Sequence, residues 1–255
     1  MRRESPSEPM NDRWIALEGK SPEEDLAPLL AKVEMLGPLS EESALWLARR
    51  TPQMRFEAGQ TVYSPRYAGT IVFALLEGRV RLYRTLGGAE ITFEIIEAGR
   101  LFGDVQALAA RRRESYAEAL LPSRVALLST RVIRHLMRES PEVGLRLAEE
   151  LSERLHEYQQ RMLDVALKKV PARLASLLER LFETEGVVSR EGVRIDTHYT
   201  HEQLATMIGS KRVAVSRAMG ELRELGAVEV KERLLYLRDE AALRLVAEEV
   251  GRREA

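Results

Sequence analysis

The residues whose types and spacing best suit binding chemistry lie between positions 200 and 225. Basic and hydroxyl side chains recur there at helical spacing, with no acidic residue between positions 210 and 220: Lys211, Arg212, Ser216 and Arg217. An arginine fork matches the O6 and N7 acceptors of guanine, and a lysine neutralises phosphate. A helix that begins with such a face is typical of one that enters the DNA major groove. The other interpretation is a helical hairpin whose charged face is solvated.

The same stretch has the pattern of two helices joined by a tight turn. Thr200 followed by Gln203 fits a capping box, which starts the first helix near position 201. Ala205 is small enough for a close helix crossing, Gly209 permits a left-handed turn, and Val215 anchors the second helix on the first. Because these three roles fall at the offsets of a helix-turn-helix, the sequence predicts that motif here.

Composition limits the remaining functions. The chain has 255 residues and a formal net charge of -1, so it is long enough for two domains and any attraction to DNA must be local. Cysteine is absent, which removes disulfides, thiolate metal sites and cysteine nucleophiles. No apolar run reaches the length of a membrane span, and the N-terminus lacks the apolar core of a signal peptide. We therefore expect a cytoplasmic protein with no membrane partner.

Short apolar and β-branched runs separated by glycine extend from Met54 to Leu128. Their spacing favours an antiparallel sandwich or roll, with a tight hairpin at Gly87-Gly88 between Val80–Leu86 and Glu90–Ile96. All four histidines lie outside this region, and the sequence has no phosphate-binding GxxxxGK loop. An enzyme built on the roll is therefore disfavoured, and we expect no metal site, no catalytic residues and no cofactor.

Helical periodicity returns near Thr130 with a short helix that ends near Ser140-Pro141, and a long helix is predicted to follow it as far as Lys169. Seven residues form a narrow apolar stripe along it: Val143, Leu147, Leu151, Leu155, Tyr158, Met162 and Val165. A narrow stripe over about six turns is typical of a coiled coil, so we predict that these residues line a homodimer interface. The alternative is a helix that packs against its own β-roll.

The order of the elements predicts four segments. Residues 1–25 form a polar tail, 26–138 a β-roll, 139–169 the dimerisation helix with its hinge, and 170–255 a winged helix-turn-helix. Pro171 fits the first turn of the helix that follows the hinge. Two further hairpins are expected, one around Arg190-Glu191-Gly192 and one, the wing, around Lys231-Glu232-Arg233.

This order of β-roll, pairing helix, hinge and winged reader resembles the cAMP receptor protein/FNR family of bacterial transcription regulators. The resemblance covers roughly residues 26–240 and is strongest in LATMIGSKRVAVSRAMGELRELG and in LFGDV of the roll. It implies an α+β fold in which a β-roll, a double-stranded β-helix of the cyclic-nucleotide-binding type, precedes a long dimerisation helix and a C-terminal winged helix-turn-helix. It also implies a homodimer that binds palindromic promoter DNA and contacts RNA polymerase, most often as an activator.

The resemblance also assigns roles on the second helix of the motif. Arg212 and Arg217 match the family's base-reading arginines, and Val213 matches the residue between them. In the cAMP receptor protein that residue is a glutamate that accepts a hydrogen bond from cytosine, which a valine cannot do. The operator is therefore expected to differ at that base pair. Three further residues are then placed for phosphate contacts: Lys211, Ser210 and Ser216.

The effector site departs from the family's pattern of a Gly-Glu pair followed about ten residues later by Arg-Ser or Arg-Thr. Gly103-Asp104 stands for the first pair, and an ungapped count puts Glu114-Ser115 at the second. A carboxylate beside a cyclic phosphate would be repelled. A one-residue deletion in the preceding loop would instead place Arg113 at the arginine's position, so both alignments stay open.

A second departure lies on the dimerisation helix. Tyr158-Gln159 replaces the hydroxyl residues that contact adenine in the family, and a tyrosine there occupies space that a purine needs. We therefore expect a homodimeric DNA-binding regulator, an activator that does not require cAMP. The alternative is a repressor gated by a cyclic nucleotide or another small molecule.

Overall fold

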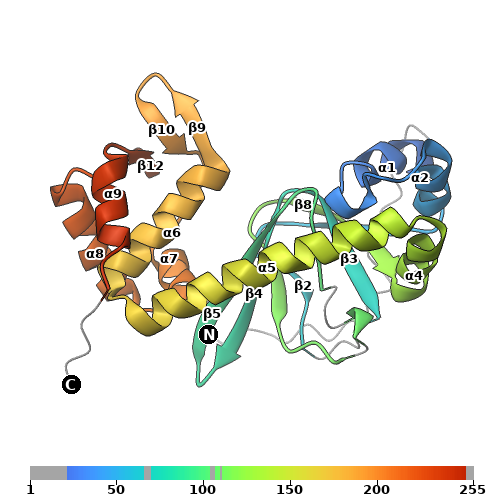
Figure 1. The fold of residues 1–255 in the computed structure, drawn as a ribbon, viewed down its shortest axis with the longest axis horizontal. Helices are drawn as coiled ribbons and strands as arrows, with labels where there is room; N and C mark the ends of the chain where they lie inside the picture. Colours follow the sequence, from blue (N-terminus) through green and yellow to red (C-terminus); the bar gives the residue numbers. More distant parts are fainter. Residues whose placement is uncertain (1–21, 66–69, 104–106, 110, 251–255) are drawn as a thin grey trace. The chain divides into compact units, whose positions relative to one another are not determined.

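The computed structural model describes residues 22–65, 70–103, 107–109 and 111–250. Figure 1 shows a mixed α and β chain, which confirms the predicted α+β class. The chain divides into two compact units. The first comprises Met1–Leu82 and Ile95–Leu151, and the second Tyr83–Glu94 and Ser152–Ala255. In the described part of the chain, no helix is both long enough and apolar enough to cross a bilayer.

Two four-stranded sheets build the predicted β-roll. The first has the order β1-β8-β3-β6, with bounds Gln53–Phe56, Ser123–Ser129, Ile71–Glu77 and Leu101–Phe102. The second has the order β2-β7-β4-β5, with bounds Thr61–Tyr63, Tyr116–Ala119, Arg79–Leu86 and Ala89–Glu97. Gly87 and Gly88 both have positive φ, 59° and 82°, so they form the expected two-residue hairpin turn between β4 and β5.

Short helices complete the first unit: α1 (Pro22–Leu30), the 3-10 helix η2 (Glu34–Leu36), α2 (Glu41–Ala48) and α4 (Thr130–Glu139). Their apolar faces pack with β3 and β8 into one core that includes Leu30, Leu36, Leu47, Val72 and Leu128. The predicted tail, residues 1–25, lies outside the described residues as far as position 21, and α1 occupies the rest.

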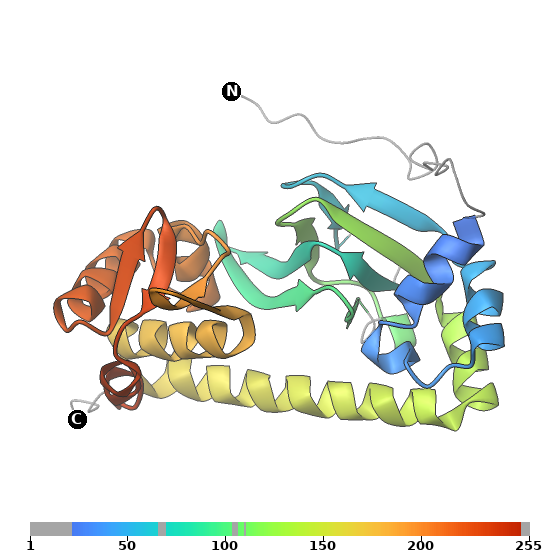
Figure 2. The same cartoon turned by 90° about the horizontal axis from the view of Figure 1, so that it is seen from above.

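The long helix α5 (Pro141–Leu167) is uninterrupted along its length (Figure 2). Val143 and Leu147 are buried in the core of the first unit, and Leu151 packs against that core. These three residues therefore cover the chain's own β-roll, which corrects the prediction that they line a dimer interface. Apolar spacing alone identifies the buried side of a helix but not the surface that buries it.

The second unit contains α6 (Val170–Glu185), α7 (His201–Met207), α8 (Arg212–Glu224) and α9 (Glu240–Ala247). Pro171 lies in the first turn of α6, as predicted. Both predicted hairpins are present and join in one sheet of order β11-β12-β10-β9, with bounds Val228–Lys231, Leu234–Leu237, Gly192–Ile195 and Gly186–Ser189. Antiparallel pairing between β10 and β12 links the two hairpins.

Local side-chain chemistry fixes the ends of α7. The Thr200 hydroxyl accepts a hydrogen bond from the Gln203 amide, and the Gln203 side chain accepts one from the Thr200 amide, which completes the predicted capping box. At the other end Gly209 adopts φ 61°, and the Ser210 amide donates to the Ala205 carbonyl over 2.9 Å. These bonds form the helix-ending motif that favours glycine.

Replacement of Thr200 by alanine should weaken the start of α7. Loss of the cap is expected to cost about 1 kcal/mol, or roughly fivefold faster exchange of the α7 amides, because an amide of the first turn loses its acceptor. Hydrogen–deuterium exchange of peptides that cover residues 200–208 measures this. Thr200→Ser keeps the acceptor and serves as the control. Equal exchange in the alanine and serine variants would show that the cap does not stabilise the helix.

Candidate nucleic-acid interface

Helix α8 is held by its apolar side. Four residues of that side are buried in the second unit, where α8 packs against α6 and α7: Val215, Ala218, Met219 and Leu222. Burial of this stripe fixes the rotation of the helix about its axis, because each of these side chains would lose its packing if the helix turned. The opposite side of α8 therefore faces outward as a rigid surface.

The outward side carries the residues predicted to bind DNA. Lys211 is the N-cap, Arg212 opens the helix, and Val213 is 73% exposed. Ser216 and Arg217 are exposed one turn later. The first turn of α8 holds no acidic residue, so the partial positive charge of the helix N-terminus adds to the side-chain charges. Among the described residues, no carboxylate forms an ion pair with these three cations.

Ser216 has a partner that the sequence interpretation missed. Its hydroxyl lies 2.8 Å from Nδ1 of His201, the first residue of α7. The contact joins the start of one helix to the middle of the other, so it fixes the Ser216 hydroxyl relative to Arg212 and Arg217. Ser210 is half-buried, and its amide is used to end α7. The sequence shows His201 only as the start of a helix, because its partner is set by the helix crossing.

Arg173 of α6 supports the turn between the two helices. Its guanidinium donates a hydrogen bond of 3.0 Å to the carbonyl of Ile208, the residue that ends α7. A cation at this end of a helix also interacts favourably with the helix dipole. The turn that precedes α8 is therefore tied to α6 as well as to its own glycine.

A second group of charges ties α6 to the end of α5. The Asp164 carboxylate of α5 lies 2.7 Å from Nζ of Lys168 and 3.2 Å from the Arg180 guanidinium of α6. Lys168 also donates to the Ser176 hydroxyl of α6 over 2.8 Å. Asp164 is largely buried, so these bonds are less screened than surface ion pairs. These bonds therefore connect the residues before and after the hinge predicted near Lys169.

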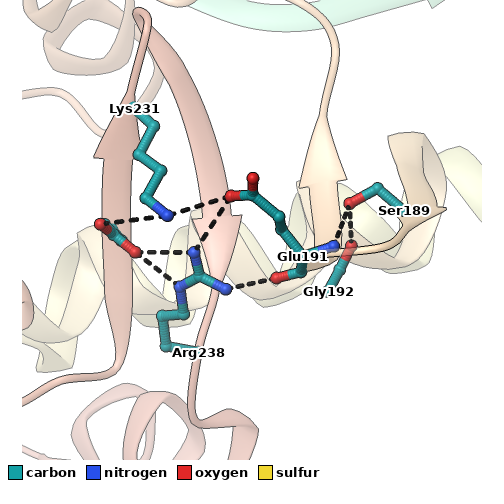
Figure 3. Close-up of polar contacts among 6 residues, drawn as sticks. Ser189, Glu191, Gly192, Lys231 and Arg238 are labelled. Atoms are coloured by element: carbon teal, nitrogen blue, oxygen red, sulfur yellow. Dashed lines mark hydrogen bonds and ion pairs between the residues drawn. The ribbon is translucent and has the colours of Figure 1, made fainter.

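Ion pairs connect the two strand hairpins of the second unit (Figure 3). Lys231 of β11 lies 3.0 Å from the Glu191 carboxylate in the β9–β10 turn, and Arg238 lies 2.7 Å from Glu229 of β11. The bond from Lys231 lowers the pKa of Glu191 below its usual value. At the tip of the wing Glu232 and Arg233 both have positive φ, 49° and 67°, in a two-residue turn. The Lys231 ammonium therefore forms an ion pair within the sheet, whereas Arg233 lies at the tip of the wing.

The two alignments of the effector site differ in whether Arg113 or Glu114 lies inside the roll. Arg113 is only 3% exposed, and Glu114 is exposed at the surface. Of the two residues, Arg113 and not Glu114 therefore lies inside the roll, as the gapped alignment expects. The carboxylate of Glu114 does not face the interior, so its charge supplies no argument against a phosphate. Asp104 lies outside the described residues.

Arg113 is engaged by the protein itself. Its guanidinium donates to the Gly103 carbonyl over 3.2 Å and to the Ile71 carbonyl, and it lies 4.2 Å from the ring centroid of Tyr63. A Cβ at Gly103 would come within 2.1 Å of the guanidinium, so only glycine allows this approach. Ser115 is buried, with its hydroxyl 3.4 Å from that of Tyr63.

The Tyr158 side chain is also hydrogen-bonded within the chain, so it is not part of the exposed apolar surface of α5. Its hydroxyl donates to the Glu94 carboxylate of β5 over 2.5 Å, and that carboxylate also lies 3.3 Å from the buried Arg154 guanidinium. Burial and the adjacent Glu94 charge raise the pKa of Tyr158 far above its ordinary value. Gln159 is exposed. The predicted effector residues therefore belong to both units, Arg113 to the first and Tyr158 to the second.

Two family models match the chain. Residues 53–140 match a cyclic nucleotide-binding domain, and residues 172–246 match a Crp-like helix-turn-helix domain. Among the described residues, no group of three or more histidine, aspartate or glutamate side chains is arranged to hold a metal ion.

The chain is also similar in sequence to three regulators of known name. The chain is 30% identical over 199 residues to the transcriptional regulator SdrP of Thermus thermophilus, which covers 77% of this chain and 94% of the relative. It is 29% identical over 191 residues to the global nitrogen regulator of Synechocystis sp., covering 74% and 85%. It is 28% identical over 193 residues to the cyclic AMP receptor protein of Thermus thermophilus, covering 75% and 86%. The chain belongs to the CRP/FNR family and is a DNA-binding transcription regulator.

Proposed function

We propose that this regulator acts as a homodimer that reads a palindromic promoter site with two copies of α8 and activates transcription by recruiting RNA polymerase, without a requirement for cAMP. The main support is the first two turns of α8, which contain no acidic residue and expose Arg212 and Arg217 opposite a buried apolar side. A cationic helix held rigidly in this way suits the major groove.

Self-association is supported by the second half of α5. Leu155, Met162 and Val165 are 58%, 66% and 56% exposed, and Leu163 and Leu167 add further exposed apolar surface. Leu155 and Met162 are one heptad apart, the spacing at which helices pair in coiled coils. The dimer interface that we propose is therefore shorter than the full stripe and is centred on these residues.

Base reading is assigned to the exposed side chains of the first two turns of α8. Arg212 and Arg217 have the fork geometry that recognises guanine, and Val213 offers a methyl surface that suits the methyl group of thymine. Lys211 is placed for phosphate, together with Ser210 and Ser216, the latter in its bond with His201. We infer that base specificity resides in Arg212, Val213 and Arg217, and that the others set affinity.

Independence from cAMP is supported by the hydrogen bonds that the predicted effector residues already make within the chain. The Arg113 guanidinium donates hydrogen bonds to the carbonyls of Gly103 and Ile71, and the Tyr158 hydroxyl donates one to Glu94. A nucleotide would have to break these bonds before it gained its own, which reduces its affinity by that free energy. One observation favours the ligand-gated alternative: Arg113 and Ser115 are both buried in the roll, where an anion of another shape could replace the carbonyls.

Replacement of Arg212 by alanine tests the reading helix. The variant should lose about 1–3 kcal/mol of binding to an operator selected from a random pool, with a smaller loss on random DNA, because a bidentate base contact is removed. Fluorescence anisotropy at fixed salt measures both. Arg223→Ala, in the last turn of the same helix, is the matched control and should bind normally. An equal loss on operator and random DNA would assign Arg212 to phosphate contact.

Addition of cAMP separates the two candidate functions. We expect operator affinity to change by less than about twofold, because coupling requires a ligand that binds one state better than the other. Titration of the operator with and without saturating cAMP measures this. A rise of about tenfold or more would contradict cAMP independence, and a fall of that size would favour the ligand-gated repressor.

A further inference from the structure

A cavity of about 640 Å³ in the first unit shares no lining residue with the group around Arg113. Its lining includes Trp46 of α2 and Arg50 of the turn that follows α2, and α4 contributes Arg131, Arg134, His135 and Arg138. None of its described lining residues is acidic. The cavity therefore combines four guanidinium groups with two aromatic rings.

The residues from α4 occupy positions one turn apart on a single helix face. Arg131, Arg134 and Arg138 are all exposed, and neither Arg131 nor Arg138 forms an ion pair with a carboxylate of the described residues. Arg134 reaches the carbonyl of Leu108 over 3.4 Å. Like charges at this spacing repel one another, and Arg131 in the first turn of α4 also opposes the helix dipole, whereas Arg138 lies in the last turn. The arrangement costs stability unless an anion joins it.

The two aromatic rings of the cavity belong to Trp46 and His135. The ring centroids of Trp46 and His135 are 4.8 Å apart, and the Arg50 guanidinium lies 4.5 Å from the Trp46 ring centroid. Trp46 therefore already holds a flat cation against its face, which is the surface that a planar ring of a ligand would use. Guanidinium groups are also the side chains best suited to bidentate binding of phosphate.

We propose that this cavity binds a nucleoside diphosphate or triphosphate. The phosphate groups would lie against Arg131, Arg134 and Arg138 along one face of α4, and the base would pack on Trp46 with Arg50 displaced toward the phosphates. This site is separate from the cyclic-nucleotide region of the roll and does not depend on the proposed dimer or on DNA reading.

Calorimetry on the full chain tests the proposal with four probes: ATP, GTP, AMP and inorganic pyrophosphate. ATP or GTP should bind at least about tenfold more tightly than AMP or pyrophosphate, because AMP offers the arginines a single phosphate and pyrophosphate has no base to pack on the ring. The double variant Arg131→Gln, Arg134→Gln should weaken ATP or GTP binding by at least about tenfold. Arg55→Gln, an exposed arginine outside the cavity, is the matched control.

The thermal midpoint without ligand separates binding from folding. The double variant should be no less stable than the wild-type chain, because the substitution relieves repulsion between like charges. Absence of binding by both nucleotides, equal affinity for pyrophosphate, or unchanged affinity in the double variant would each overturn the proposal. Binding of a short polyglutamate peptide in place of nucleotides would also overturn it and would identify an acidic protein surface as the partner.

Discussion

Apolar surface left in water on the second half of α5 is the constraint on which the proposed assembly depends. The first half of the helix buries Val143 and Leu147 in its own unit, whereas Leu155, Met162 and Val165 remain exposed beyond it. Removal of such side chains from water contributes about 25 cal/mol per Å² of apolar area. A second copy of the same helix offers a matching apolar surface, so the proposed pairing would need no other partner and would set the separation of the two reading helices.

The connection from this helix to the reading helix is made of short, directed contacts. Asp164 bonds Arg180 of α6, Arg173 of α6 bonds the carbonyl of Ile208, and the Gly209 turn leads into α8. Because each contact fixes one element relative to the next, the second unit can present Arg212 and Arg217 in a defined orientation. Glu94, Arg154 and Tyr158 add a buried polar contact between β5 and α5 in the same unit. A ligand that broke the bonds between α5, α6 and the turn before α8 would change the orientation of α8.

The reading motif could be predicted from sequence because its determinants are local. The capping pair Thr200 and Gln203 and the positive φ of Gly209 depend on residues within one or two turns. The effector region could not be settled in this way, since a one-residue shift in a loop decides whether Arg113 or Glu114 points inward. The surface that covers each half of α5 and the partner of Ser216 depend on tertiary packing, which periodicity does not encode.

The spacing of the two half-sites shows whether the two reading helices bind DNA as a pair. Two readers held by one pairing helix each should require major grooves about 34 Å apart, or about 10 base pairs from centre to centre. Insertion of about 5 base pairs between the half-sites of a selected operator turns one groove to the opposite side of the duplex, and we predict a loss of at least about tenfold in affinity at fixed salt. Equal affinity for the altered operator, or for a single half-site, would contradict a paired reader.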